Sequence, residues 1–484
     1  MKKPELLLPA GSFERMKTAF LYGADAVYCG TPSMSLRAKS QFTIEEVKEG
    51  VELAKQLGKR VYLTLNLFAH NKDLERLPEF VKTLREIQPH GVIVADPAIF
   101  MYLRENAPEL NLHASTQSSI TSWKAVEFWK NLGAKMTVLA REVSIEDMKI
   151  IKEKCPDVKI ETFLHGSMCM SYSGRCLLSN FLANRGANQG KCAHCCRWLY
   201  KLHIKLKDGT LKEIEINENN RDLFEFLIEE EHRPGDLLEV VETEHMANIL
   251  NSKDLCLLPK IPDFVNAGID CLKVEGRNKT QYYVALVAKT YRRAIDDYIS
   301  DPKNWKAEDY LSELYTISNR GFSLAFADGD LEHFANNYDS TKSTSEFEFA
   351  GYITKTDDNF VYYLVKNKTV LGDELEFITP AGENIKLTVT KLVNSENDEE
   401  LREVNSGLEM IVKIPFDDFT GYNKKFLKDN LKELVVARKS NNISDVDRAR
   451  INLDKESYKI EMGYGSEEKY LQLKNELLKL LNKA

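Results

Sequence analysis

Short apolar runs alternate with longer amphipathic segments through the first 165 residues of the chain. Segments such as FERMKTAFLYG and TIEEVKEGVELAKQLG place apolar residues at helical spacing, which predicts helices between the apolar runs. The runs themselves predict seven strands, at residues 5–8, 26–28, 61–66, 91–95, 112–115, 136–139 and 160–164. An eighth run, at 271–275, follows another helical stretch, LLPKIPDFVNAG.

The regular alternation of strand and helix predicts a parallel sheet covered by helices. Eight such units are typical of a TIM-type (β/α)8 barrel, here with an insertion between the seventh and eighth strands. An open doubly wound sheet is the alternative. The first strand is followed by Pro9-Ala10-Gly11-Ser12 and not by G-x-G-x-x-G, which disfavours dinucleotide binding.

The same pattern predicts the domain organisation. A barrel domain covers residues 1–340 and includes a cysteine-rich loop at 166–200 and an inserted β subdomain at 201–245. In that insertion LHIKLKDGTLKEIEI alternates apolar and polar residues around an Asp-Gly pair, which is a hairpin signal. Short alternating strands then predict a small β-barrel domain at 345–420, and helical spacing returns in a tail at 421–484.

Composition and charge narrow the class of protein. No apolar run approaches the ~18 residues of a membrane span, and the N-terminal apolar stretch is too short for a signal peptide, so we expect a cytoplasmic protein without membrane segments. Nine cysteines are an odd count in a long chain, which favours reduced thiols over a disulfide framework. The net charge of −8 counts against a broad nucleic-acid-binding surface but leaves a local basic patch open.

Polar residues follow most of the predicted strands. In a barrel the carboxyl ends of the strands meet at one end, where the chemistry of this fold takes place. Loops after strands are often polar for solvation alone, but a set spread over so many strand ends favours a site. The set comprises Asn66, Asp96, Ser115, Thr116, Gln117, Arg141, Glu142, His165, Glu275 and Arg277.

Five of the nine cysteines lie between positions 169 and 196. Six residues separate Cys169 from Cys176, and fifteen separate Cys176 from Cys192. Three residues separate Cys192 from Cys196. Thiolates bind zinc or iron–sulfur clusters, and zinc sites usually use two tight pairs of cysteines. Single cysteines spread over a glycine-containing loop favour a cluster, while the tight pair Cys192 and Cys195 keeps zinc as an alternative.

The residues around these cysteines form a motif: Glu161, Phe163, Gly166-Ser167-Met168-Cys169, Gly174, Cys176, Leu178 and Ser179. This motif is similar to the signature of peptidase family U32. The resemblance covers roughly residues 1–340, and the β domain after them looks like the family's C-terminal domain. The segment CLLSNFLANRGANQGKC, followed by CRW, resembles the branch of the family that hydroxylates tRNA.

The family is named for collagenase-like proteolysis, but the resemblance implies oxygen-independent hydroxylation with a 4Fe-4S cluster. For the tRNA branch it implies conversion of the wobble uridine to 5-hydroxyuridine, with prephenate as a required metabolite and with tRNA and a paralogous subunit as partners. Other branches act on ribosomal RNA or ubiquinone precursors. Carried over to this chain, the resemblance implies that the cluster ligands are Cys169, Cys176, Cys192 and Cys196. For the fourth position, Cys195 and Cys256 stay open as alternatives to Cys196.

The strand-end residues suggest roles in such a reaction. Guanidinium groups bind carboxylates in bidentate fashion, so Arg141 and Arg277 are candidates to hold a prephenate-like acid. Glu142, Glu275 and His165 are candidate catalytic acids or bases.

Two other functions stay open. A collagenase-like peptidase needs an activated nucleophile or a metal-bound water, and the chain contains neither H-E-x-x-H nor G-x-S-x-G. A Cys169–His165 pair could supply a nucleophile only if that thiolate were not a metal ligand. The second function is that of a non-catalytic RNA-binding protein. Its phosphate contacts would come from lysines of the insertion, namely Lys201, Lys205, Lys207 and Lys212.

Overall fold

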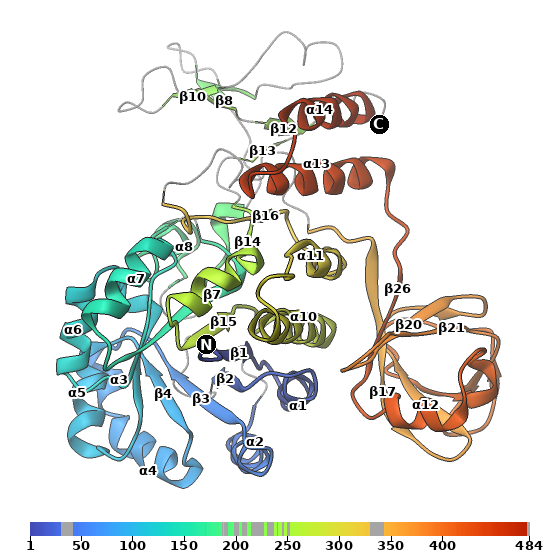
Figure 1. Ribbon diagram of the computed structural model, residues 1–484, viewed down its shortest axis with the longest axis horizontal. Coiled ribbons are helices and arrows are strands. Elements are labelled where there is room, and N and C mark those ends of the chain that lie inside the picture. Colours follow the sequence, from blue (N-terminus) through green and yellow to red (C-terminus); the bar gives the residue numbers. More distant parts are fainter. Residues whose placement is uncertain are drawn as a thin grey trace.

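Eight parallel strands close into a barrel in the first part of the chain (Figure 1). The computed structural model describes the backbone of six short strands between 203 and 248, and residues 1–30, 42–169, 171–185, 187, 192–197, 252–329 and 343–481. The barrel strands are β1 (Glu5–Pro9), β2 (Ala26–Gly30), β3 (Arg60–Leu65), β4 (Gly91–Val94), β5 (Leu112–Ala114), β6 (Met136–Val138), β7 (Lys159–Ser167) and β15 (Cys271–Val274).

Strand β15 closes the barrel because it pairs in parallel with both β1 and β7. Cys271 lies opposite Glu5 on one side and opposite Glu161 on the other. The TIM-type barrel and all eight of its strands are therefore confirmed, and the open doubly wound sheet is wrong, since such a sheet would leave its end strands unpaired.

Amphipathic helices cover the outside of the barrel, as their spacing predicts. They are α1 (Phe13–Leu21), α2 (Ile44–Gln56), α4 (Leu77–Ile87), α5 (Pro97–Asn106), α6 (Trp123–Asn131), α7 (Ile145–Lys154), α9 (Ile261–Asn266) and α10 (Gln281–Ser300). Their apolar faces form one large core with the outer faces of the strands. A separate apolar cluster fills the barrel interior and contains Leu7, Ala26, Tyr28, Tyr62, Ile93, Met136 and Cys271.

The insertion after β7 begins with the cysteine segment, which includes the short helix α8 (Leu178–Ala183) and the 3-10 turn Cys195–Arg197. Strands β8 (His203–Lys205) and β9 (Leu211–Glu213) then pair in antiparallel fashion, as the hairpin signal predicts. Two further antiparallel pairs follow, formed by β10 (Leu227–Glu229) with β11 (Leu237–Glu239) and by β12 (Val241–Thr243) with β13 (Met246–Asn248).

The chain returns to the barrel through β14 (Asp254–Cys256), which pairs antiparallel with the carboxyl end of β7. Strand β16 (Phe322–Ser323) extends this edge. The helical hairpin of α13 (Asp445–Glu461) and α14 (Glu467–Leu481) packs on it, away from the β domain (Figure 1). Tyr458 of α13 donates a hydrogen bond to the carbonyl of Cys256, and Lys253 donates to Ser457 Oγ at 2.7 Å.

The β domain forms an antiparallel sheet around its own apolar core. Its strands are β17 (Phe347–Thr356), β18 (Phe360–Val365), β20 (Glu374–Ile378), β21 (Ile385–Thr388), β22 (Leu392–Asn394), β23 (Glu400–Leu401), β25 (Ile411–Pro415) and β26 (Val436–Ser440).

The predicted end of this domain at 420 is wrong. Strand β26 pairs with both β17 and β20, so residues 436–440 belong to the sheet. The helix α12 (Lys424–Asn430) also belongs to the domain, because Leu427 and Leu431 lie in its core. The helical tail therefore begins at Asp445.

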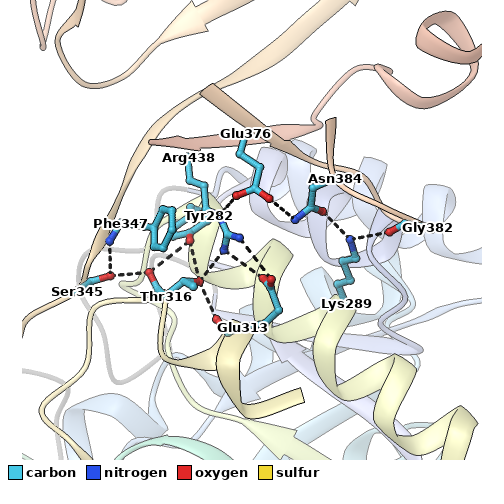
Figure 2. Close-up of polar contacts among 10 residues, drawn as sticks. All are labelled: Tyr282, Lys289, Glu313, Thr316, Ser345, Phe347, Glu376, Gly382, Asn384 and Arg438. Atoms are coloured by element: carbon cyan, nitrogen blue, oxygen red, sulfur yellow. Dashed lines mark hydrogen bonds and ion pairs between the residues drawn. The ribbon is translucent and has the colours of Figure 1, made fainter. Parts of the chain in front are cut away.

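Polar contacts join the β domain to helix α10 and to α11 (Glu308–Leu314) of the barrel domain (Figure 2). Arg438 of β26 lies at the centre, where its guanidinium donates to Glu376 at 2.7 Å and to Glu313 at 3.1 Å. Burial is the largest single influence on Arg438 and would lower its pKa, but the bond to Glu376 and the interactions with Tyr282 and Glu313 together outweigh burial and raise the pKa. Nearby, Lys289 of α10 donates to Asn384 Oδ1 at 2.9 Å and to the carbonyl of Gly382 at 3.3 Å.

The lysine in this interface predicts a pH dependence. Burial lowers the pKa of Lys289 from 10.5 to about 8 in the folded protein. Between these two pH values the unfolded chain binds more protons than the folded chain, so this residue makes the protein more stable as the pH rises. The melting temperature of the wild type relative to Lys289→Gln should therefore increase by a few degrees across this window. The control is Lys55→Gln, which changes an exposed lysine of α2. A difference in melting temperature between the wild type and Lys289→Gln that does not change with pH would contradict the prediction.

Candidate functional site

Ser173 fastens the cysteine segment to the carboxyl end of the barrel. Its backbone N–H and its hydroxyl donate to Glu142 Oε1 at 2.8 Å and 3.3 Å. The N–H of Arg141 donates to Ser173 Oγ at 3.3 Å, and Ser119 donates to the Ser173 carbonyl. Because Arg141 and Glu142 follow β6 and Ser119 lies just beyond β5, the segment is attached to two neighbouring strand ends.

Gly174 explains why the backbone can come so close at this point. It has a φ of +79°, a conformation that favours glycine. A Cβ placed on Gly174 would lie 2.1 Å from the carbonyl oxygen of Gln117. Any larger residue would push the cysteine segment away from the loop after β5.

The two parts of the cysteine segment are tied together by α8. Ser179 of this helix donates to the carbonyl of Arg185 at 2.7 Å and accepts a hydrogen bond from the N–H of Ala193 at 2.9 Å. Residues 192–196 are thereby joined to the part of the segment that contains Cys169 and Cys176.

The thiols of this segment differ in exposure. Cys169 is exposed, Cys176, Cys192 and Cys196 are half-buried, and Cys195 is 1% exposed. Burial raises the pKa of the Cys195 thiol, and the neighbouring thiols of Cys192 and Cys176 raise it further. Cys176, Cys192 and Cys195 are therefore close enough to interact electrostatically.

These thiols have the right chemistry for a metal cluster. None of the nine cysteines forms a disulfide, and the segment places its thiols next to the open end of the barrel. Among the described residues, however, no group of three or more His, Cys, Asp or Glu side chains is already arranged as a metal site. The donors fit a cluster by type and location, without a preformed geometry.

Cys256 and His165 lie in a different environment. They face each other across β14 and β7, and the side chains of both contact the hydroxyl of Tyr291 in α10. The rings of Tyr283 and Phe322 also pack on His165. Burial lowers the pKa of His165 to about 3, so its imidazole is neutral at physiological pH. The structure thus packs both residues against α10, and their proposed catalytic and ligand roles stay predictions.

The interior of the barrel contains an ion pair that the sequence alone did not reveal. Lys273 of β15 donates to Glu161 Oε1 of β7 at 2.6 Å, with side-chain exposures of 6% and 0%. A charged residue in the middle of a buried apolar strand is the sequence signal for such a pair, because an unpaired buried charge is strongly unfavourable.

Cations and aromatic rings alternate around this ion pair. Arg141 lies over the ring of Phe163 at 3.7 Å, and Lys273 lies 5.6 Å from the same ring. On its other side Lys273 lies 4.5 Å from the ring of Tyr28, which Arg277 approaches at 5.8 Å. We call these five residues the cation–ring series. It brings the two predicted arginines into one region of the barrel, with Lys273 between them.

Several buried polar atoms near the strand ends have no hydrogen-bond partner in the described part of the chain. They are Asn66 Oδ1, Gln117 Oε1, Arg141 Nε and Glu142 Oε2. Buried polar atoms are nearly always paired in folded proteins, so a group of orphans at one end of a barrel indicates a place for a polar ligand.

The other strand-end residues have roles within the fold. Asp96 caps α5 by accepting from the N–H groups of Ala98 and Ile99, and Ser115 caps the 3-10 turn that follows β5. Thr116 donates to the carbonyl of Leu139 at 3.1 Å. Arg277 donates to Thr64 Oγ1 at 2.8 Å.

Glu275 is half-buried directly after β15, and its carbonyl accepts a hydrogen bond from the hydroxyl of Tyr283 at 2.8 Å. The lysines Lys201 and Lys207 lie outside the described residues, as do the side chains of Lys205 and Lys212.

The barrel, its thiol segment and the cations of its interior define a TIM-barrel protein with a candidate ligand site at the carboxyl end of its strands. The model of peptidase family U32 matches residues 11–336, and the model of the family's C-terminal domain matches residues 345–425. The chain belongs to peptidase family U32.

Relatives within the family carry different names. The protein "tRNA hydroxylation protein P1" of Bacillus subtilis is 38% identical over 82% of this chain and 89% of its own length. In the same organism "tRNA hydroxylation protein P2" is 30% identical over 67% of this chain and 98% of its own length. A "Collagenase" of Porphyromonas gingivalis is 31% identical over 66% of this chain and 72% of its own length. No described helix is long and apolar enough to cross a membrane.

Proposed function

We propose that this chain is an enzyme that hydroxylates tRNA, converting the wobble uridine to 5-hydroxyuridine without molecular oxygen. The observation that carries the proposal is the attachment of the cysteine segment, through Ser173, to Arg141 and Glu142 at the open end of the barrel. Relatives named for tRNA hydroxylation support the choice of substrate. The two relatives of one organism also support a paralogous partner subunit.

A 4Fe-4S cluster is the proposed cofactor. Cys169, Cys176, Cys192 and Cys196 would hold it, and Cys195 stays an alternative fourth ligand because its thiol lies near those of Cys176 and Cys192. When bound, such a cluster supplies redox or Lewis-acid chemistry at the end of the barrel. The protein's own part is to keep the thiols beside the strand ends, which the contacts of Ser173 and Gly174 do.

The cation–ring series is the proposed site for an organic acid. Arg141 and Arg277 would bind the carboxylates of a prephenate-like molecule, since guanidinium matches carboxylate in bidentate geometry. Lys273 lies between them, but Glu161 neutralises its charge, so the two arginines supply the positive charge of this site. The Nε of Arg141, which has no partner in the described part of the chain, offers a donor for this ligand.

Acid–base chemistry at this site would fall to Glu142 and Glu275. Ser173 engages one oxygen of Glu142, while the other oxygen has no partner among the described residues and can accept a proton. A uridine must leave its base stack to reach this end of the barrel, as base-modifying enzymes require. Asn66 and Gln117, whose side-chain oxygens have no partner among the described residues, offer acceptors to the imide N–H of such a base.

The cluster makes a direct prediction about iron. Protein purified without oxygen should contain about four irons per chain. Changing Cys169, Cys176, Cys192 or Cys196 to Ala should remove the iron, because each loses a thiolate ligand. The matched controls Cys29→Ala, Cys155→Ala and Cys271→Ala should keep it.

Iron and acid-labile sulfide assays provide the measurement. Stoichiometric zinc without iron in the wild type would contradict the cluster. Retention of iron by Cys196→Ala together with its loss from Cys195→Ala or Cys256→Ala would reassign the fourth ligand.

The substrate is tested in the host. Deleting the gene, along with any paralogue, should remove 5-hydroxyuridine and its derivatives from wobble positions, as measured by nucleoside mass spectrometry of digested tRNA. A complementing copy of the gene that carries Arg277→Ala should restore the modification only poorly. The substitution removes charge-assisted bonds to the carboxylate ligand, which are worth about 1.5–3 kcal/mol each, or roughly ten- to a hundredfold in binding.

An unchanged wobble profile in the deletion strain would overturn the proposal. Cleavage of gelatin by the pure protein would then favour the peptidase, and a lost modification in ribosomal RNA would favour that substrate.

A further inference from the structure

Large apolar side chains are exposed on the cysteine segment. Phe181 is 89% exposed, Leu177 71%, Tyr172 64% and Leu182 43%. We call these residues, together with the exposed Arg175 and Arg185, the α8 surface. Two of its members are aromatic, and an exposed apolar patch of this kind usually marks an interaction site.

The charge of this segment is opposite to that of the whole protein. The chain has a net charge of −8, yet residues 168–197 contain no Asp or Glu. The same residues contain Arg175, Arg185, Lys191 and Arg197. Aromatic side chains beside arginines fit a polyanion that also presents flat rings, and this is the chemistry of unpaired nucleotides.

The position of the α8 surface fits a substrate that enters the barrel. Tyr172 directly precedes Ser173, which is attached to Arg141 and Glu142 at the strand ends. Helix α8 carries Phe181 and is joined through Ser179 to residues 192–196. Nucleotides held on this surface would therefore lie beside both the thiols and the strand ends.

We propose that the α8 surface binds unpaired nucleotides of an RNA substrate. This inference rests on the proposed function and extends it. Bases stack on Tyr172 and Phe181, and flanking phosphates pair with Arg175 and Arg185. A double helix hides its base faces, so the surface selects looped or frayed RNA.

Binding of the full-length protein to two RNAs tests this surface. One is a hairpin whose loop contains uridine, and the other is the same sequence closed into a complete duplex. Phe181→Ala and Tyr172→Ala should each weaken hairpin binding about five- to a hundredfold, the usual effect of losing one stacked base, with little effect on the duplex. The matched control is Phe426→Ala, which removes a 38% exposed phenylalanine from α12 of the β domain.

The arginines have a separate readout. Arg175→Ala and Arg185→Ala should each reduce the slope of log affinity against log salt by about 0.7, the value for one phosphate contact on a single strand. This change in salt dependence would not follow from a purely structural role of these exposed side chains.

The outcomes separate the surface from the proposed function. If the wild type binds the hairpin and Phe181→Ala binds it equally well, the inference that the α8 surface binds RNA is wrong. The proposed RNA hydroxylation is not affected by this outcome. If wild-type protein is a dimer by sedimentation and Phe181→Ala is a monomer with unchanged RNA binding, the surface joins copies of the chain and the inference is overturned. If the wild type binds neither RNA and the deletion strain keeps its wobble modification, the proposed function fails first.

Discussion

The attachment of Ser173 to Glu142 and Arg141 is the interaction on which the organisation of the site depends. Together with the hydrogen bond from Ser119 to the Ser173 carbonyl, it attaches the interior of the cysteine segment to the barrel. With it, the loops after β5 and β6 hold the thiols beside the cationic interior. Gly174 makes the contact possible, because only glycine fits against the carbonyl of Gln117 at that φ.

Electrostatics explain how an acidic protein could bind the anionic partners proposed for it. Its surplus of negative charge lies outside residues 168–197, while Arg141, Lys273 and Arg277 gather at the barrel interior and lie against aromatic rings. Cations placed over ring faces in a partly desolvated site attract carboxylates more strongly than exposed lysines do. The proposed recognition of anions therefore rests on this local arrangement and not on the net charge.

The barrel could be predicted from the sequence because strand and helix spacing recur seven times in the first 165 residues and once more after the insertion. Features that depend on contacts between distant residues could not. Lys273 and Glu161 are 112 residues apart, and nothing local shows that they pair. The sequence pattern ends the seventh strand at residue 164, but β7 extends to Ser167 because β14 pairs with its end. The pattern predicts no strand at β26, because VARKS is short and charged. The polar strand ends were found, but Asp96 and Ser115 proved to be caps.

The proposed iron site requires docking of the cysteine segment on the barrel end. Iron content per chain in Gly174→Ala, measured beside Gly58→Ala after anaerobic purification, tests it most directly. Both glycines have positive φ, but a Cβ on Gly58 meets nothing within 4 Å, whereas one on Gly174 lies 2.1 Å from the Gln117 carbonyl. If docking is required, Gly174→Ala should lose most of its iron and Gly58→Ala should keep it. Full iron in a folded Gly174→Ala protein would contradict it.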